Sequence, residues 1–338
     1  MPGKLTFGFV YDLRNPARWR RRWEDVYAET LDFAVWSESA GYAGAWVPEH
    51  HLADDGYVPT PQVVLGALAA RTSTIRLGSG VVLAPLHHPV RFAEECAVLD
   101  IIARGRLEMQ LAIGYRRLET QMFGVDFSKR GRMFDEFLEI VTRLWAGEEV
   151  TYAGQFYQVT GARLSPPAPR GRIPLHIGGF TKRALARAVR YADGYSGTVE
   201  GAELYLAKLR EAGRDCTNPS MRVTMQYFAV AEEPARALAE LAPYYLHVYN
   251  SYADWIAEDE AVGVAEEFTF RRVSLDEFVA RGIFKVLSPA EAIAMLRALR
   301  ARIPAEHVML TLPPGIPPEE FCPYAELFAR EVIPAFAA

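Results

Sequence analysis

The chain has 338 residues, of which 50% are hydrophobic and 23% are charged, and its formal net charge is −5. This balance is typical of a globular protein with a large core, and the lack of a basic excess argues against a nucleic-acid partner. Its three cysteines, Cys96, Cys216 and Cys322, form no C-x-x-C pair, so we expect neither a disulfide framework nor a zinc ribbon. The sequence has no signal-peptide core and no apolar run near the about 18 residues of a membrane span. We therefore expect a cytoplasmic protein that binds neither nucleic acid nor membrane.

From the N-terminus onward, short apolar runs alternate with stretches whose apolar residues have helical spacing. Residues 5–11 alternate as a strand does, residues 24–40 have helical spacing and end at Gly41, and residues 43–47 form the next apolar run. The alternation continues as a helix at 61–72, a strand at 75–83, a helix at 90–103, a strand at 107–113 and a helix at 127–145. Strands separated by helices indicate βαβ units and a parallel sheet.

Two segments of the second half interrupt this alternation. Residues 149–152 and 156–159 flank a short turn and indicate a β-hairpin, which an irregular, proline-containing connection follows. Residues 258–284 are charged and contain glycine breaks, so we interpret them as an insertion. Elsewhere we expect strands at 175–177, near Tyr195, at 221–231 and at 308–312, and helices at 182–192, 203–212, 235–256, 289–302 and 318–328.

Eight strand-like runs lie outside the hairpin, and most of them are followed by a helix. Eight parallel strands close a barrel whose interior is filled by its own side chains. We therefore predict an α/β protein with a (β/α)8 TIM-barrel fold, as one domain over residues 1–338 with an insertion at about 258–284. The alternative is a doubly wound open sheet, which would need a reversal of strand order that sequence cannot show.

Titratable side chains follow the second predicted strand directly. Parallel α/β folds carry their sites at the carboxyl-terminal ends of the strands, and here Glu49, His50 and His51 follow one. A histidine at this place can pass protons near neutral pH, and a neighbouring carboxylate could fix its tautomer. Adjacent histidines in an extended chain point to opposite sides, so we expect one to face away from the site and no metal to be bound. The alternative is a pair of loop histidines hydrogen-bonded to the backbone.

Glycines interrupt the predicted strand at 75–83. Gly78 and Gly80 lie within it, where glycine often marks a bulge or the close approach of another group. Tight packing inside the barrel would explain them equally well.

A glycine turn also follows the predicted strand at 175–177. Gly178 and Gly179 lead into a helix that begins near Thr181. Free amides and the positive end of a helix dipole suit a phosphate group, and Lys182 and Arg183 add positive charge. An ordinary glycine turn before an N-capped helix would need no ligand.

Several short segments occur together and in a fixed order along the chain. They are residues 41–51, 80–85 with 88–91, 105–107 with 113–115 and 123–124, 178–181 with 192–194, and the tail at 328–334. As a collinear set they resemble the bacterial luciferase-like flavin monooxygenases. The resemblance runs from about residue 5 to the carboxyl terminus.

This resemblance implies a barrel that binds either reduced FMN, which acts with O2, or the deazaflavin F420. The Glu-His-His segment matches a pattern in which the first histidine is essential, so the resemblance implies a catalytic role for His50. It also implies a non-prolyl cis peptide bond between Gly80 and Val81 against the flavin ring. The cofactor-binding residues that it implies are Gly80, Val81, Gly114, Tyr115, Gly178, Gly179, Phe180 and Thr181.

The sequence departs from the family pattern at one position. Luciferase-type chains place a phosphate-binding arginine where this chain has Ile113. Arg116 and Arg183 are candidates to replace it. The departure leaves the choice between FMN and F420 open.

The implied function is that of a flavin-dependent monooxygenase acting with reduced FMN and O2 on a small organic substrate. A separate flavin reductase would supply the reduced flavin, and the chain would form a homodimer or a larger homo-oligomer. Three alternatives stay open: an F420-dependent oxidoreductase that transfers a hydride, a non-catalytic flavin-binding protein, and a barrel enzyme with a phosphorylated substrate and no flavin.

Overall fold

The computed structural model describes residues 4–217, 219–260 and 271–337, and within them eight parallel strand positions close into a barrel. Around the barrel these are β1 (Thr6–Val10), β2 (Gly44–Val47), β3 (Arg76–Ser79) with its continuation β4 (Val82–Leu83), β5 (Leu107–Ala112), β8 (Leu175–Ile177), β9 (Gly194–Gly197), β10 (Ser220–Met225) and β13 (His307–Thr311). Phe9 of β1 pairs with Ala45 on one side and with Leu310 on the other, so the first and last strands complete the ring. The predicted TIM barrel is confirmed, and the open sheet is excluded.

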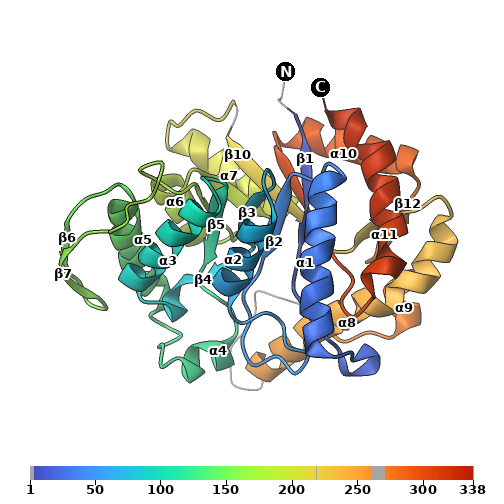
Figure 1. The fold of residues 1–338 in the computed structure, drawn as a ribbon, viewed down its shortest axis with the longest axis horizontal. Coiled ribbons are helices and arrows are strands. Elements are labelled where there is room, and N and C mark those ends of the chain that lie inside the picture. Colours follow the sequence, from blue (N-terminus) through green and yellow to red (C-terminus); the bar gives the residue numbers. More distant parts are fainter. Residues whose placement is uncertain (1–3, 218, 261–270, 338) are drawn as a thin grey trace.

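Helices surround the barrel, as Figure 1 shows. They are α1 (Trp23–Ser39), α2 (Pro61–Arg71), α3 (Pro89–Ile102), α4 (Arg117–Met122), α5 (Arg130–Trp145), α6 (Lys182–Tyr191), α7 (Val199–Glu211), α8 (Pro234–Glu260), α9 (Leu275–Ala280), α10 (Pro289–Arg302) and α11 (Pro318–Leu327). Local signals set several boundaries: Gly41, with a φ of 94°, follows the end of α1, and Ser288 and Glu291 form a capping box that begins α10. Helix α4 was not predicted, because six residues are too few to show a helical period.

Two predicted strands are interrupted in the structure. The strand at 75–83 divides into β3 and β4 at the Gly80–Val81 peptide bond, which is cis. The strand at 221–231 divides into β10 and β11 (Phe228–Val230), and β11 pairs with β12 (Lys285–Leu287) in a separate two-stranded sheet. Both divisions occur at the carboxyl-terminal end of a barrel strand, where the backbone leaves the regular ladder.

Two segments lie outside the regular alternation of strands and helices, the hairpin and the insertion. The predicted hairpin is the antiparallel pair β6 (Val150–Ala153) and β7 (Gln158–Ala162), which extends away from the barrel in Figure 1. Of the predicted insertion at 258–284, residues 261–270 lie outside the described residues, and the rest includes the end of α8 and all of α9. In the described part of the chain, no helix is both long enough and apolar enough to cross a bilayer.

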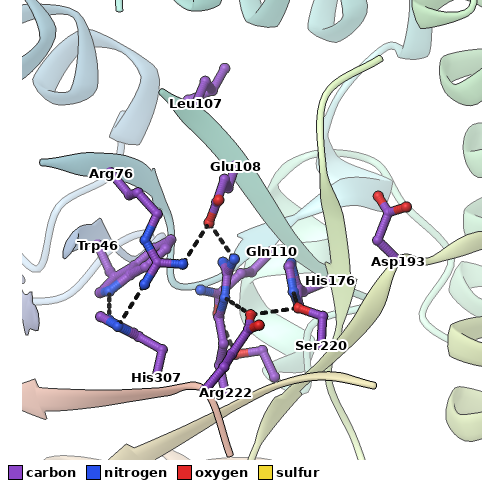
Figure 2. A network of polar contacts seen from close by, with 12 residues as sticks. Trp46, Arg76, Leu107, Glu108, Gln110, His176, Asp193, Ser220, Arg222 and His307 are labelled. Atoms are coloured by element: carbon purple, nitrogen blue, oxygen red, sulfur yellow. Dashed lines mark hydrogen bonds and ion pairs between the residues drawn. The ribbon is translucent and has the colours of Figure 1, made fainter. Parts of the chain in front are cut away.

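A polar layer fills the barrel near the amino-terminal ends of its strands, as Figure 2 shows. Arg222 of β10 is buried and forms an ion pair with Glu108 of β5. Its guanidinium also lies over the ring of Trp46, 4.7 Å from the ring centre, and the Trp46 Nε1–H donates to His307 Nε2 at 2.9 Å. This end of a TIM barrel contributes to stability, whereas sites lie at the other end.

Candidate active site

One cavity of about 310 Å³ opens among the carboxyl-terminal ends of β4, β5, β8 and β9. Most of the predicted site residues line it: His50, Val81, Gly114, Tyr115, Gly178, Gly179, Phe180 and Thr181. Gly80 is not among the lining residues and lies next to Val81 in the chain. Predicted residues from four strand ends that are far apart in the sequence are thus brought to one cavity.

His50 lies at the cavity within a cage of aromatic rings. Its ring centre lies 4.7 Å from that of Tyr57 and 5.1 Å from that of Trp255. The rings of Tyr115 and Tyr252 follow at 5.7 and 6.1 Å. Tyr252 and Trp255 belong to α8, so this helix forms one wall around the histidine. The His50 side chain is only 9% exposed, which fixes its orientation by packing.

The carboxylate beside His50 is Glu119, not its sequence neighbour Glu49. His50 Nδ1 lies 2.8 Å from Glu119 Oε1, and the same oxygen accepts the backbone N–H of His51 at 2.9 Å. Burial raises the pKa of the Glu119 carboxyl, but the hydrogen bond and charge of His50, with the His51 amide and Arg116, outweigh burial and hold the pKa below its usual range. Glu119 is therefore ionised at neutral pH.

Glu49 instead joins His51 to the cavity wall. Its buried carboxylate accepts from the Leu83 amide at 2.6 Å, and its Oε1 lies 3.0 Å from His51 Nε2 and 2.8 Å from His87 Nε2. Burial alone would raise the pKa of Glu49, but these hydrogen bonds lower it to about 2. The two adjacent histidine side chains thus have different carboxylate partners, Glu119 for His50 and Glu49 for His51. Among the described residues, no group of three or more His, Cys, Asp or Glu side chains is arranged to hold a metal ion.

The start of α6 also lines the cavity. Thr181 is the N-cap residue, and its Oγ1 accepts the amide of Ala184 at 3.2 Å. Gly179 has a φ of 109°, and a Cβ there would lie 2.9 Å from the Cβ of Ala184, so the turn requires glycine. The amino-terminal turn of this ten-residue helix, with its free amides and the positive end of the helix dipole, contributes Thr181 and Ala184 to the cavity lining.

Two arginines that were not predicted from the sequence also line the cavity. Arg130 Nε donates to the Gly114 carbonyl at 3.1 Å, and its guanidinium lies 3.5 Å from the ring centre of Phe127. Arg187 Nη2 donates to the Gly131 carbonyl at 2.8 Å, and its Nε pairs with Asp135 at 2.5 Å. Both guanidiniums are thus held in place by backbone carbonyls beside the α6 turn.

Neither arginine suggested by the sequence lies on the cavity. Arg116 is buried, donates to the His51 carbonyl at 2.9 Å and lies over Trp255, and Arg183 is exposed on α6. The strand-end rule does not predict Arg130 and Arg187, because each lies on a helix and not directly after a strand. Glu119 was missed because it lies in an unpredicted helix, seven residues beyond the end of β5. An acidic residue shortly after a strand is a weak signal that could have found it.

The cavity suits a planar, phosphorylated ligand. Its lining combines apolar side chains with the start of α6 and the guanidiniums of Arg130 and Arg187; the apolar ones are Val81, Leu83, Ala112, Ile113, Phe134 and Ile177. Apolar walls accept a flat ring, and amides with arginines accept a phosphate. The residues present therefore fit the ring and the phosphate of a flavin mononucleotide, and His50 is among them.

Comparison with known proteins gives the family. The family model described as luciferase-like monooxygenase matches residues 6–305. The chain therefore belongs to the luciferase-like monooxygenase family, whose members are flavin-dependent monooxygenases or oxidoreductases.

Individual relatives differ in the cofactors and substrates that their names give. The chain is 32% identical over 192 residues to an F420-dependent glucose-6-phosphate dehydrogenase of Microbacterium testaceum, covering 54% of this chain and 56% of the relative. It is 26% identical over 251 residues to the oxygenase component of the flavin-dependent trigonelline monooxygenase of Acinetobacter baylyi, covering 71% and 69%. Thus the chain spans only about half the length of some curated relatives that it matches.

The fold also matches that of a solved structure. The monooxygenase RslO1 from Streptomyces bottropensis superposes with a TM-score of 0.84 at 24% identity, covering 98% of this chain and 100% of that one. At this identity the likeness concerns the fold alone.

Proposed function

We propose that this chain is a monooxygenase that binds reduced FMN in the described cavity and uses O2 to oxygenate a small organic substrate. The observation that carries the proposal is that His50, the Val81 wall and the Gly178–Thr181 turn line one cavity. Family membership supports a flavin cofactor, and the trigonelline relative supports oxygenation of a small molecule.

Each end of the cavity would hold a different part of FMN. The phosphate would bind at the start of α6. Arg130 and Arg187 would take the role of the family's phosphate-binding arginine, whose position is occupied by Ile113 in this chain. The ring would lie between the apolar side chains near Val81 and Leu83, close to His50. Reduced FMN, when bound, supplies the electrons with which O2 is activated.

The chain's own contribution is placement, exclusion of water and proton exchange. The apolar middle of the cavity keeps bulk water from the reacting atoms, which protects unstable species from hydrolysis. His50, which faces the cavity from its aromatic cage, exchanges a proton during the reaction.

Reduced flavin must come from elsewhere, so we include a separate reductase in the proposal. The trigonelline relative is named as an oxygenase component, which supports a two-component system. We also propose that the protein lies in the cytoplasm and forms a homodimer or a larger homo-oligomer. Light scattering during gel filtration would test the oligomeric state.

An F420-dependent hydride transfer is the second candidate. The 32% identical dehydrogenase relative and the absence of an arginine at Ile113 favour it. It would use the same cavity without O2.

Titration of the purified protein with FMN, riboflavin and F420, followed by fluorescence, separates these functions. We expect FMN to bind more tightly than riboflavin because of its phosphate. We expect the FMN-loaded, chemically reduced protein to convert a substrate and O2 into oxygenated product and water as the FMN is reoxidised. Binding of F420 in preference to FMN would instead support hydride transfer. Binding of FMN with no oxygenated product from any substrate would support a flavin-binding protein, and binding of none of the three would show that the cavity holds no flavin.

Replacing Arg130 by methionine tests the phosphate end directly. A charge-assisted hydrogen bond contributes about 1.5–3 kcal/mol, so we expect Arg130→Met to weaken FMN binding roughly 10- to 100-fold. Riboflavin has no phosphate, so its affinity should stay unchanged. Arg190→Met, on the exposed side of α6, is the control. Equal losses of FMN and riboflavin binding would show that Arg130 only supports the fold.

A further inference from the structure

The two nitrogens of the His50 ring have different surroundings. Nδ1 lies 2.8 Å from Glu119 Oε1. Among the described residues, no protein group forms a hydrogen bond with Nε2, although the imidazole lines the cavity. The ring thus has one nitrogen toward a buried carboxylate and one without a protein partner.

The Glu119 carboxylate is committed to accepting hydrogen bonds. Its Oε1 accepts the His51 amide and lies 3.5 Å from Arg116 Nη1. Its side chain is only 1% exposed, and Oε2 has no partner within the described residues. A buried carboxylate that is stabilised by donors at one oxygen stays ionised and offers only lone pairs, so the atom facing it must carry a hydrogen.

We propose that Glu119 is the positioning residue that holds His50 in its Nδ1–H form, so that Nε2 faces the cavity as a proton acceptor. Which nitrogen of a neutral histidine carries the proton is set by the hydrogen bond that the other makes. The orientation is reinforced by packing, because Tyr57 and Trp255 enclose the ring and restrict its rotation.

The local fold explains why Glu119 and not Glu49 has this role. Glu119 lies in the first turn of α4, which follows the loop that supplies Gly114 and Tyr115 to the cavity. Glu49 is adjacent to His50 in sequence, but its oxygens are used by Leu83, His51 and His87. The role of Glu119 in catalysis rests on the proposed function, whereas the tautomer does not.

The tautomer can be measured on the protein without any added cofactor. Long-range ¹H–¹⁵N correlation of ¹⁵N-histidine-labelled protein shows which ring nitrogen carries the proton, and a His50→Gln variant assigns the signal. At a pH where the ring is neutral, we expect His50 to be protonated at Nδ1 alone. In Glu119→Gln, which removes the carboxylate charge, we expect the Nε2–H form to appear. Glu94→Gln, on the exposed side of α3, is the matched control and should keep the wild-type pattern.

Two results would overturn the inference. One is a wild-type His50 protonated mainly at Nε2, and this result stands even if Glu119→Gln fails to fold. The other is an unchanged tautomer in a folded Glu119→Gln variant. Since no flavin is present, failure of this inference is distinct from failure of the proposed FMN chemistry, which the cofactor titration decides.

Discussion

Glu49 shows how one buried carboxylate can hold a cavity wall. It accepts the amide of Leu83 and lies within hydrogen-bond distance of His51 and His87. Leu83 lines the cavity, so the position of this wall depends on a side chain from the neighbouring strand end. The Glu-His-His segment therefore combines one residue that faces the cavity with two that fix its wall.

Removing this carboxylate should lower stability. In Glu49→Ala, the buried Leu83 amide loses its acceptor, and an unsatisfied buried donor costs about 1–3 kcal/mol. We expect a decrease of at least this size in the free energy of unfolding, measured with urea. The exposed Glu94→Ala variant should change it by less than about 0.5 kcal/mol. Equal, small effects of both variants would show that Glu49 does not hold the wall.

At the scale of elements, the turn between β8 and α6 depends on close backbone contact. A Cβ on Gly178 would lie 2.7 Å from the carbonyl oxygen of Ser196, which belongs to the neighbouring strand β9. Because the contacted atom is backbone, the two strand ends must separate to make room. Both residues line the cavity, so this separation would change the site as well as the fold.

We expect Gly178→Ala to destabilise the protein by about 1–3 kcal/mol, the usual cost of overpacking, and to weaken FMN binding. Gly66 is the matched control, because it lies in α2 and a Cβ there would meet no atom within 4 Å. Gly66→Ala should be neutral or stabilise by up to about 1 kcal/mol. Urea unfolding and flavin titration measure both quantities, and a neutral Gly178→Ala would contradict the packing argument.

Most helices and strands of this protein could be predicted from the sequence, whereas the contacts between the side chains of the site could not. The alternation of apolar runs and helical stretches was enough for the barrel, and the strand-end rule brought His50 and Gly179 to one cavity. The partners of these residues could not be predicted, because they depend on tertiary contacts. Glu119 lies 69 positions from His50, and Arg187 reaches the cavity only because α6 packs beside α5.

At the scale of the whole molecule, the polar layer inside the barrel makes stability depend on pH. His176 and His307 belong to this layer (Figure 2), and burial, with the positive charges of Arg76 and Arg222, holds the pKa of each well below 6.5. Below about pH 6.5 the unfolded chain binds protons on these histidines that the folded chain does not bind. Folding therefore becomes less favourable as the pH falls through this range.

We expect each histidine to lower the free energy of unfolding by up to about 1.4 kcal/mol per pH unit below pH 6.5. Burial raises the pKa of Asp12 to about 6, so this carboxyl stabilises the folded protein as the pH falls, opposite to the histidines. The pH slopes of variants must therefore be compared with that of the wild type. His176→Asn should have a smaller slope between pH 6.5 and 5 than the wild type, whereas the exposed His88→Asn should not differ. Urea unfolding across this range measures the slopes, and an unchanged slope for His176→Asn would contradict the assignment.

The central claim is that one cavity holds FMN with its phosphate at the α6 end and its ring near His50. The most direct test is a crystal structure of the protein with FMN. The account predicts the phosphate within hydrogen-bond distance of the first α6 amides and of Arg130 or Arg187, and the ring against Val81 with His50 beside it. A phosphate at the opposite end of the cavity, or FMN bound elsewhere on the protein, would contradict the account.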